Sequence, residues 1–105
     1  MCRIAYDLVI TNPPYTHALP FAEKGLSLLV PGGYLALLLR LNWLEGVRKN
    51  PRYAFLRETR PNAYVLPRRP RFGDAKGTDS CAYAWIVWCK DKQLGGLYFL
   101  EDHNA

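Results

Sequence analysis

The residues of this chain best suited to chemistry are four consecutive ones, Asn12, Pro13, Pro14 and Tyr15, which follow an apolar, strand-like run at residues 7–10. Each proline fixes its own φ angle and lacks a backbone donor, so the chain must leave the strand in a stiff, extended turn with exposed carbonyl groups. The Asn12 amide oxygen and the Pro13 carbonyl can then accept hydrogen bonds, and the Tyr15 ring offers a flat stacking surface. This combination suits a planar base that carries an exocyclic amine.

The segment resembles the NPPY motif of amino-group DNA methyltransferases, in particular those of the adenine-N6 class, which depend on S-adenosylmethionine. A second region is similar to the same family: the Pro- and Arg-rich residues 66–72 are followed by residues 77–80 and by the aromatic-rich residues 83–88. In these enzymes the second region places an aromatic ring against the base, and the resemblance implies that Phe72 is that ring. The two regions together cover roughly residues 6–89.

The resemblance implies a mechanism for methyl transfer to an amine. The exocyclic nitrogen of adenine is a poor nucleophile because its lone pair is delocalised into the ring. Acceptors that bind its two hydrogens, here the Asn12 side chain and the Pro13 carbonyl, would favour a more tetrahedral and electron-rich nitrogen. Tyr15 and Phe72 would stack on the base after it has left the duplex, and so hold the amine in line with the methyl group of S-adenosylmethionine. This chemistry needs no metal.

The elements that hold the methyl donor in this family are missing from the sequence. They include a Gly-rich loop after an earlier strand and an acidic residue that binds the ribose, whereas only five residues precede Tyr6. The pair Gly32-Gly33 follows a proline and predicts a helix-to-strand turn instead of a cofactor cradle. The resemblance therefore covers the carboxyl-terminal catalytic half only. We expect S-adenosylmethionine as the cofactor by resemblance alone, and no binding of it by the isolated chain.

Basic side chains gather in the middle of the chain. The net charge is +5, and residues 47–73 carry eight basic side chains against one acidic one, Glu58. Arginine contacts phosphate oxygens with a planar fork, so this block is expected to bind DNA or a protein with a polyanionic or nucleic-acid groove. An ordinary solvated basic face is the alternative. The candidate contact residues are Arg48, Lys49, Arg52, Arg68, Arg69 and Arg71.

Length and composition predict one domain. A chain of 105 residues, of which 50% are hydrophobic, can form a single core, so residues 1–105 are expected to make one methyltransferase-like half-domain. The three cysteines lack C-x-x-C spacing, which indicates neither a disulfide framework nor a zinc site and favours a cytoplasmic location. The apolar residues 26–41 are interrupted by Pro31 and are too few to span a membrane, so no membrane association is expected.

The spacing of apolar residues predicts an α/β fold. Strands are expected at residues 6–11, 34–41, 63–66, 83–89 and 97–100, and helices at residues 18–29 and 44–58, the second interrupted at Pro51. Because residues 34–41 are almost continuously apolar, their strand is expected to be covered on both faces. These elements indicate a truncated Rossmann-like methyltransferase half-domain, with three layers and a mixed sheet of about four or five strands. Residues 67–80 form one long loop, which carries Phe72.

Truncation has a predicted consequence for assembly. In the complete fold the strand Tyr6–Thr11 lies beside a strand of the cofactor half, so here its outer edge would be bare. An exposed apolar edge is a template for another strand. The expected partner is a second copy, which joins this strand antiparallel across a twofold axis to give a homodimer. Cover by the amino-terminal residues or by a partner chain is the alternative.

Three functions remain open from the sequence. In the first, the chain is a nucleic-acid-binding or interaction protein of methyltransferase descent that does not methylate alone, for instance a small phage or mobile-element inhibitor of a nucleic-acid-processing complex. In the second, it is the catalytic fragment of a split methyltransferase that is active with a partner chain. The third is a degenerate remnant without activity. The intact NPPY segment favours the second function, and the missing cofactor half favours the first.

Overall fold

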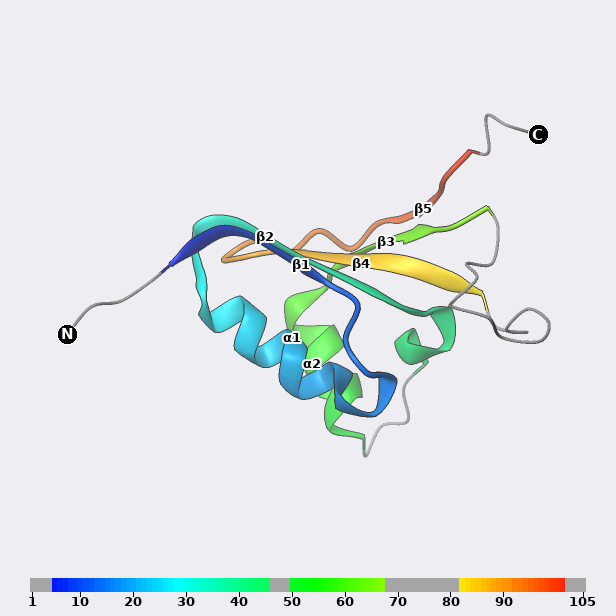
Figure 1. Cartoon of the computed structure of the whole chain (residues 1–105), viewed down its shortest axis with the longest axis horizontal. Helices are drawn as coiled ribbons and strands as arrows, with labels where there is room; N and C mark the ends of the chain where they lie inside the picture. The colour runs from blue at the N-terminus through cyan, green and yellow to red at the C-terminus, as the bar shows by residue number, and fades with distance from the viewer. Residues whose placement is uncertain (1–4, 46–49, 68–81, 102–105) are drawn as a thin grey trace.

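The computed structural model describes residues 5–45, 50–67 and 82–101 of the chain. These residues form five strands and two α-helices, whose arrangement Figure 1 shows. In chain order they are β1 (Tyr6–Thr11), α1 (Ala18–Ser27), β2 (Leu29–Arg40), α2 (Pro51–Thr59), β3 (Asn62–Val65), β4 (Tyr83–Cys89) and β5 (Leu97–Phe99). Short 3₁₀ helices, Tyr15–His17 and Leu41–Leu44, follow β1 and β2.

The strands form one mixed sheet in the order β1-β2-β4-β3-β5. β1 and β2 are parallel and are connected by α1, whereas β4 pairs antiparallel with both β2 and β3, and β5 is parallel to β3. This topology confirms the predicted α/β fold with a mixed sheet. β1 lies at one edge, with β2 as its neighbour in the described part of the chain. Pairing of that edge with a second copy stays a prediction.

Both α-helices lie on the same face of the sheet (Figure 1). Leu35 of β2 lies so close to Gly25 of α1 that a Cβ atom at the glycine would come within 2.7 Å of the leucine side chain. Trp88, which pairs with Leu35 across the sheet, contacts Phe55 of α2 with the ring centroids 6.0 Å apart. The described residues therefore form two layers, and the prediction of three layers was wrong for this part of the chain.

The side chains of β2 explain why two layers are found where three were predicted. Leu35, Leu37 and Leu39 are at most 2% exposed, whereas Tyr34 is 48% exposed and Leu38 is half-buried. Successive side chains of a strand point to opposite faces, so every second residue of the apolar run enters the core. The other residues lie on the face that carries no described helix. Continuous hydrophobicity shows that both faces are apolar, but not that both are covered.

β2 also begins earlier than predicted, at Leu29. The predicted helix-to-strand turn is part of this strand, and a shift in the register with β1 marks a bulge between Leu29 and Tyr34. Gly33 lies in the bulge, where a Cβ atom would be 3.0 Å from the carbonyl oxygens of Asp7 and Val30. The glycine is therefore needed for close backbone packing. The prediction of a turn at this point was wrong.

α2 begins at Pro51 instead of being interrupted there. A proline suits the first helical position because its missing N–H would have no intrahelical partner. Asn50 caps the helix, with its Oδ1 accepting a hydrogen bond from the Arg52 N–H at 2.9 Å. At the other end the chain leaves the helix through Arg60, which has a left-handed φ of 43°. The predicted helical stretch at residues 44–58 is thus a 3₁₀ helix and a separate α-helix.

The core lies between the helices and the sheet. Trp43 and Trp88 pack edge to face, with their ring centroids 6.1 Å apart and an interplanar angle of 81°. The Trp88 Nε1–H donates a hydrogen bond to Thr59 Oγ1 at 2.9 Å, so its one polar atom is satisfied inside the core. The largest fully buried side chains are those of Trp43, Trp88, Leu35, Leu37, Leu39 and Ile86.

Two further observations apply to the described ranges alone. Neither helix in them has the length and apolar character that crossing a bilayer requires. Their His, Cys, Asp and Glu side chains do not gather in a group of three or more that could hold a metal ion.

Candidate functional site

The NPPY segment leaves the sheet at the carboxyl end of β1. Asn12 and Pro14 are exposed, while Pro13 is buried and anchors the turn. The next three residues form the 3₁₀ helix, which is closed by a hydrogen bond from the His17 N–H to the Pro14 carbonyl at 2.9 Å. α1 follows directly. The turn is therefore held on one side by β1 and on the other by α1.

Two hydrogen-bond acceptors on this turn are not used by the part of the chain that the structure describes. Among the described residues, none donates a hydrogen bond to the Asn12 side chain or to the Pro13 carbonyl, whereas the Pro14 carbonyl accepts from His17. Acceptors on adjacent residues can receive the two hydrogens of one amino group. In the described residues both acceptors are thus unused, and their contact with a base stays a prediction.

Other segments reach the same end of the sheet. β2 runs parallel to β1 and ends there, and β4 runs the other way and begins there. The Leu41 N–H donates to the Ala82 carbonyl at 2.8 Å, and the Leu66 N–H donates to the Tyr83 carbonyl at 3.0 Å. The described residues Leu66 and Ala82 therefore lie at the end of the sheet that carries Asn12.

Most of the other predicted site residues lie outside the described ranges. Nothing is described of the Tyr15 side chain, although its backbone begins the 3₁₀ helix. Stacking of Tyr15 and Phe72 on a base stays a prediction for this reason. The predicted residues outside the described ranges are Phe72, Arg48, Lys49, Arg68, Arg69 and Arg71.

Arg52, the described member of the predicted basic surface, is built into the fold. It is half-buried, its Nη2 donates to the Glu45 carbonyl at 2.8 Å, and its guanidinium carbon lies 5.7 Å from the centroid of the Trp43 ring. These contacts join α2 to the 3₁₀ helix after β2. Sequence reasoning missed these contacts because the sequence around Arg52 does not indicate that its guanidinium packs on the Trp43 ring. A phosphate contact by Arg52 stays a prediction and would have to coexist with this packing.

An open, mostly apolar cavity of about 520 Å³ also lies at this end of the sheet, between the 3₁₀ helix Leu41–Leu44 and β5. Its wall on β5 includes Phe99, which is 74% exposed. β5 and β1 occupy opposite edges of the sheet, and strands lie about 4.8 Å apart, so roughly 19 Å separates the two edges. That wall is therefore too distant to contact a base held by Asn12.

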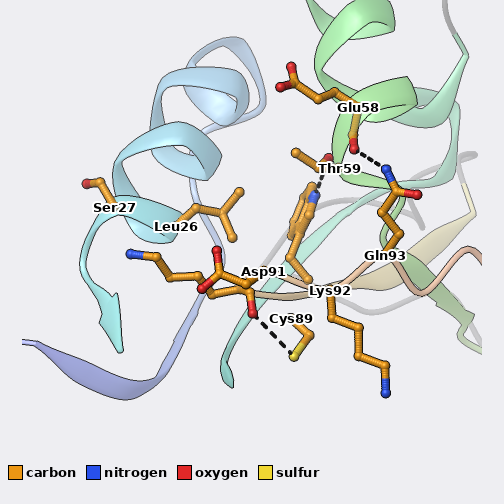
Figure 2. A pocket seen from close by; sticks show the side chains of 10 residues that line it. Leu26, Ser27, Glu58, Thr59, Cys89, Asp91, Lys92 and Gln93 are labelled. Atoms are coloured by element: carbon orange, nitrogen blue, oxygen red, sulfur yellow. Dashed lines mark hydrogen bonds between the residues drawn. The ribbon is translucent and has the colours of Figure 1, made fainter. Parts of the chain in front are cut away.

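A second cavity, of about 460 Å³, lies at the opposite end of the sheet (Figure 2). Two of the polar side chains around it form hydrogen bonds within the fold: the Trp88 Nε1–H donates to Thr59, and Gln93 Nε2 donates to the Glu58 carbonyl at 2.7 Å. These hydrogen bonds tie the end of α2 to β4 and to the chain that follows it. The cavity marks a structural junction, remote from the NPPY segment.

Comparison with known proteins finds a likeness in fold and none in sequence. No protein-family model matches the chain, and no curated protein does. A solved structure from Listeria monocytogenes, assigned to the class I S-adenosylmethionine-dependent methyltransferases, matches with a TM-score of 0.61 and 17% identity, over 94% of this chain and 37% of that one. A complex of M1.HpyAVI with S-adenosylmethionine matches with a TM-score of 0.42 and 18% identity, over 95% of this chain and 59% of that one.

At these identities the likeness concerns the fold alone. Each of the two proteins is also much longer than the matched region, which amounts to 37% of the Listeria protein. The matched region includes the mixed sheet and the helices that pack on one face of it, since it takes in nearly all of this chain. The chain is therefore similar in its α/β fold to part of the Listeria protein, and it spans 37% of that protein's length.

Proposed function

We propose that this chain supplies the base-binding part of a methyltransferase site of the adenine-N6 type, and that it does not transfer methyl groups alone. The observation that carries the proposal is the pair of unused acceptors on Asn12 and Pro13, at the carboxyl end of β1. In open α/β sheets, ligands bind outside the carboxyl ends of the parallel strands. The fold likeness to a methyltransferase supports the same function.

In this role the residues of the chain bind and orient the amine. The Asn12 amide oxygen and the Pro13 carbonyl accept one hydrogen each from the exocyclic nitrogen, which keeps its lone pair directed away from the ring plane. Because β1 and α1 hold the turn, the acceptors need no rearrangement when the base arrives, and such preorganised dipoles are effective in catalysis. Tyr15 is the expected stacking partner on the same turn.

The described residues do not fit S-adenosylmethionine. A cradle for it needs a Gly-rich loop ahead of a helix amino terminus, whereas α1 follows the NPPY turn and α2 follows Asn50. Gly33 is occupied by its own backbone neighbours, which leave no room for a ligand. We therefore assign the binding of the methyl donor to residues other than the described ones, so that the described residues make up one part of the site.

Calorimetric titration of S-adenosylmethionine into the isolated chain tests the proposal. We expect no binding at micromolar concentrations, because the described residues lack a cradle, and no methyl transfer to DNA by the chain alone. A complete S-adenosylmethionine-dependent methyltransferase serves as the positive control for both assays. Micromolar binding by the lone chain would show that it holds its own cofactor site.

The proposed contact with DNA makes a separate prediction for the segment 68–81. Replacing Arg68, Arg69 and Arg71 with glutamine is expected to weaken DNA binding. The negative slope of log K against log salt should become shallower, by about 0.9 for each lost phosphate contact. Fluorescence anisotropy with a labelled duplex at several salt concentrations measures this slope. Replacement of the exposed Lys24 and Lys92 with glutamine is the control, and it should change the slope less.

Equal slopes for the wild-type chain and the triple variant would show that these arginines make no phosphate contacts and form an ordinary solvated surface. A protein target with an acidic groove would also respond to the substitutions. The anisotropy of the labelled duplex reports DNA binding itself, and unlabelled duplex should displace it in proportion to the competitor concentration.

A further inference from the structure

Three aromatic side chains occupy one row on the face of the sheet that carries no described helix. Trp85 of β4 pairs with Tyr64 of β3, and Tyr64 pairs with Tyr98 of β5. Paired residues of neighbouring strands lie on the same face, and successive residues of one strand alternate between faces. Trp88 contacts Phe55 of α2, so Trp85, three residues earlier in the strand, lies on the face away from the helices (Figure 1). We call Trp85, Tyr64 and Tyr98 the aromatic row.

The two tyrosine rings of this row form a stack. Their centroids are 5.1 Å apart and the ring planes are inclined by 16°. This distance is close to the spacing of about 4.8 Å between neighbouring strands, so both rings project from the sheet with their faces turned along the row. β5 is an edge strand, and Tyr98 is 50% exposed. The ring face of Tyr98 that is turned away from Tyr64 therefore has no described strand beside it and is open to a planar ligand.

Contacts within the fold hold both rings in place. Asn62 Nδ2 donates a hydrogen bond to the Tyr64 hydroxyl at 3.2 Å, and Asn62 Oδ1 accepts one from the Gly96 N–H at 2.7 Å. The Tyr98 ring lies so close to Gly96 that a Cβ atom at the glycine would come within 2.6 Å of it. A larger residue at position 96 would therefore displace the ring. Because the rings are already ordered, stacking on them costs little side-chain entropy.

We propose that the aromatic row binds the bases of single-stranded nucleic acid. Every base has a flat face that can stack on a tryptophan or tyrosine ring, and aromatic side chains on a sheet surface are one way in which proteins bind unpaired bases. In a duplex these base faces are covered by neighbouring base pairs, so the row selects unpaired strands. The inference concerns a surface on other strands than the NPPY turn and does not depend on the proposed function.

Charge favours a polyanion as the ligand of this face. The chain has a net charge of +5, which attracts nucleic acid and repels a second copy of the chain. The strands β2, β3, β4 and β5 contain no acidic residue on either face. Trp85 pairs with Leu38, and the next row on the same face pairs Arg40 with Tyr83. A basic residue therefore lies in the row beside the aromatic row.

The size of the face suits a short single strand better than a protein. The sheet has five strands, which at a spacing of about 4.8 Å make it about 20 Å wide, and β4 extends for about 23 Å. The product, roughly 450 Å² in plan, is below the ~600 Å² that a stable protein interface takes from each partner. A strand of about four nucleotides needs no such area, because each stacked base makes its own contribution.

Fluorescence anisotropy of a labelled oligothymidylate, titrated with the full chain, tests the proposal. Tyr98→Ala removes one stacking ring and should weaken binding by about 5- to 100-fold, the effect of losing one stacked base. Tyr98→Phe keeps the ring and should bind as tightly as the wild-type chain. Phe21→Ala is the matched control, because it removes a ring that is 44% exposed on α1, and it should also bind like the wild type. Circular dichroism confirms that each variant is folded.

Two further measurements separate stacking from a general charge effect. Gly96→Ala changes no ring and no charge, yet it should weaken binding of the single strand because it displaces the Tyr98 ring. Trp43 and Trp88 are at most 2% exposed, whereas Trp85 is half-buried in the aromatic row. A base stacked on the row should therefore quench mainly the Trp85 emission, and the quenching should saturate together with the anisotropy.

Duplex DNA distinguishes this surface from the predicted arginine contacts. Its affinity should be the same for the wild-type chain and Tyr98→Ala, because paired bases do not reach the row. Titration of oligouridylate identifies the source of the strand: tighter binding of RNA or of DNA names the natural ligand, and either supports the proposal. Unchanged single-strand affinity in Tyr98→Ala, or unquenched Trp85 at saturation, would overturn it. A wild-type chain that binds no single strand would also overturn it, in favour of a protein on this face.

Discussion

Replacing Asn12 with alanine is expected to lower methyl transfer by two to three orders of magnitude in any complex that supplies the methyl donor to this chain. The substitution removes one of two preorganised acceptors, and loss of a single such group commonly costs about 10²–10³ in rate. The free energy of unfolding should change by less than about 1 kcal/mol, because the Asn12 side chain is exposed and no described residue bonds to it. Transfer of a labelled methyl group to DNA measures the rate.

Two variants on the same turn make this result interpretable. Asn12→Asp keeps an acceptor oxygen at the same position, so it should retain more activity than Asn12→Ala. Thr16→Ala removes a side chain whose hydrogen bond, at 3.1 Å, is to the neighbouring His17 ring, and it should leave the rate unchanged. Methyl transfer at the wild-type rate by Asn12→Ala would show that Asn12 does not bind the amine.

The largest effect on stability is expected for Trp88→Ala, which should lower the free energy of unfolding by about 3–5 kcal/mol. Trp88 is 1% exposed, packs against Trp43 and Phe55, and bonds to Thr59. Its removal leaves a large cavity at the centre of the helix-facing core. Total stability of a domain is typically about 5–15 kcal/mol, so the melting temperature should fall by more than about 10 °C.

Chemical denaturation followed by circular dichroism measures this loss. Phe21→Ala is the matched control, because it truncates an aromatic side chain that is 44% exposed on α1. It should cost less than about 1 kcal/mol. Equal losses for the two variants would mean that the core does not lie between β4 and the helices.

Strands with a clear boundary signal could be predicted from the sequence. β1 ends where two prolines remove backbone donors, and the aromatic and β-branched residues of β4 leave little doubt about its extent. The start of β2 could not be predicted, because Gly33 usually signals a turn and only the bulge against β1 shows why it stands in a strand. Pro51 was similarly ambiguous, since a proline either interrupts a helix or begins one, and the cap at Asn50 decides the matter.

The site was predictable where its chemistry is local. Asn12 and Pro13 lie on one turn, so their types and order are enough to indicate a pair of acceptors. The surroundings of Arg52 were not predictable, because the ring that it covers, Trp43, belongs to a different element and reaches it only through the tertiary fold. The number of layers was equally non-local: an apolar strand looks the same whether one face is covered or both are.

The central position of β4 affects how the chain is made. β3 reaches β2 only through β4, which the ribosome synthesises after both of them. Before β4 has left the ribosome, β1, α1 and β2 can form one unit. β3 then lacks its antiparallel partner, and α2 lacks its contact with Trp88. Such unpaired edges attract chaperones and other nascent chains. The sheet closes in one step when β4 enters between its neighbours, so translation of β4 is the point at which a released chain becomes able to fold.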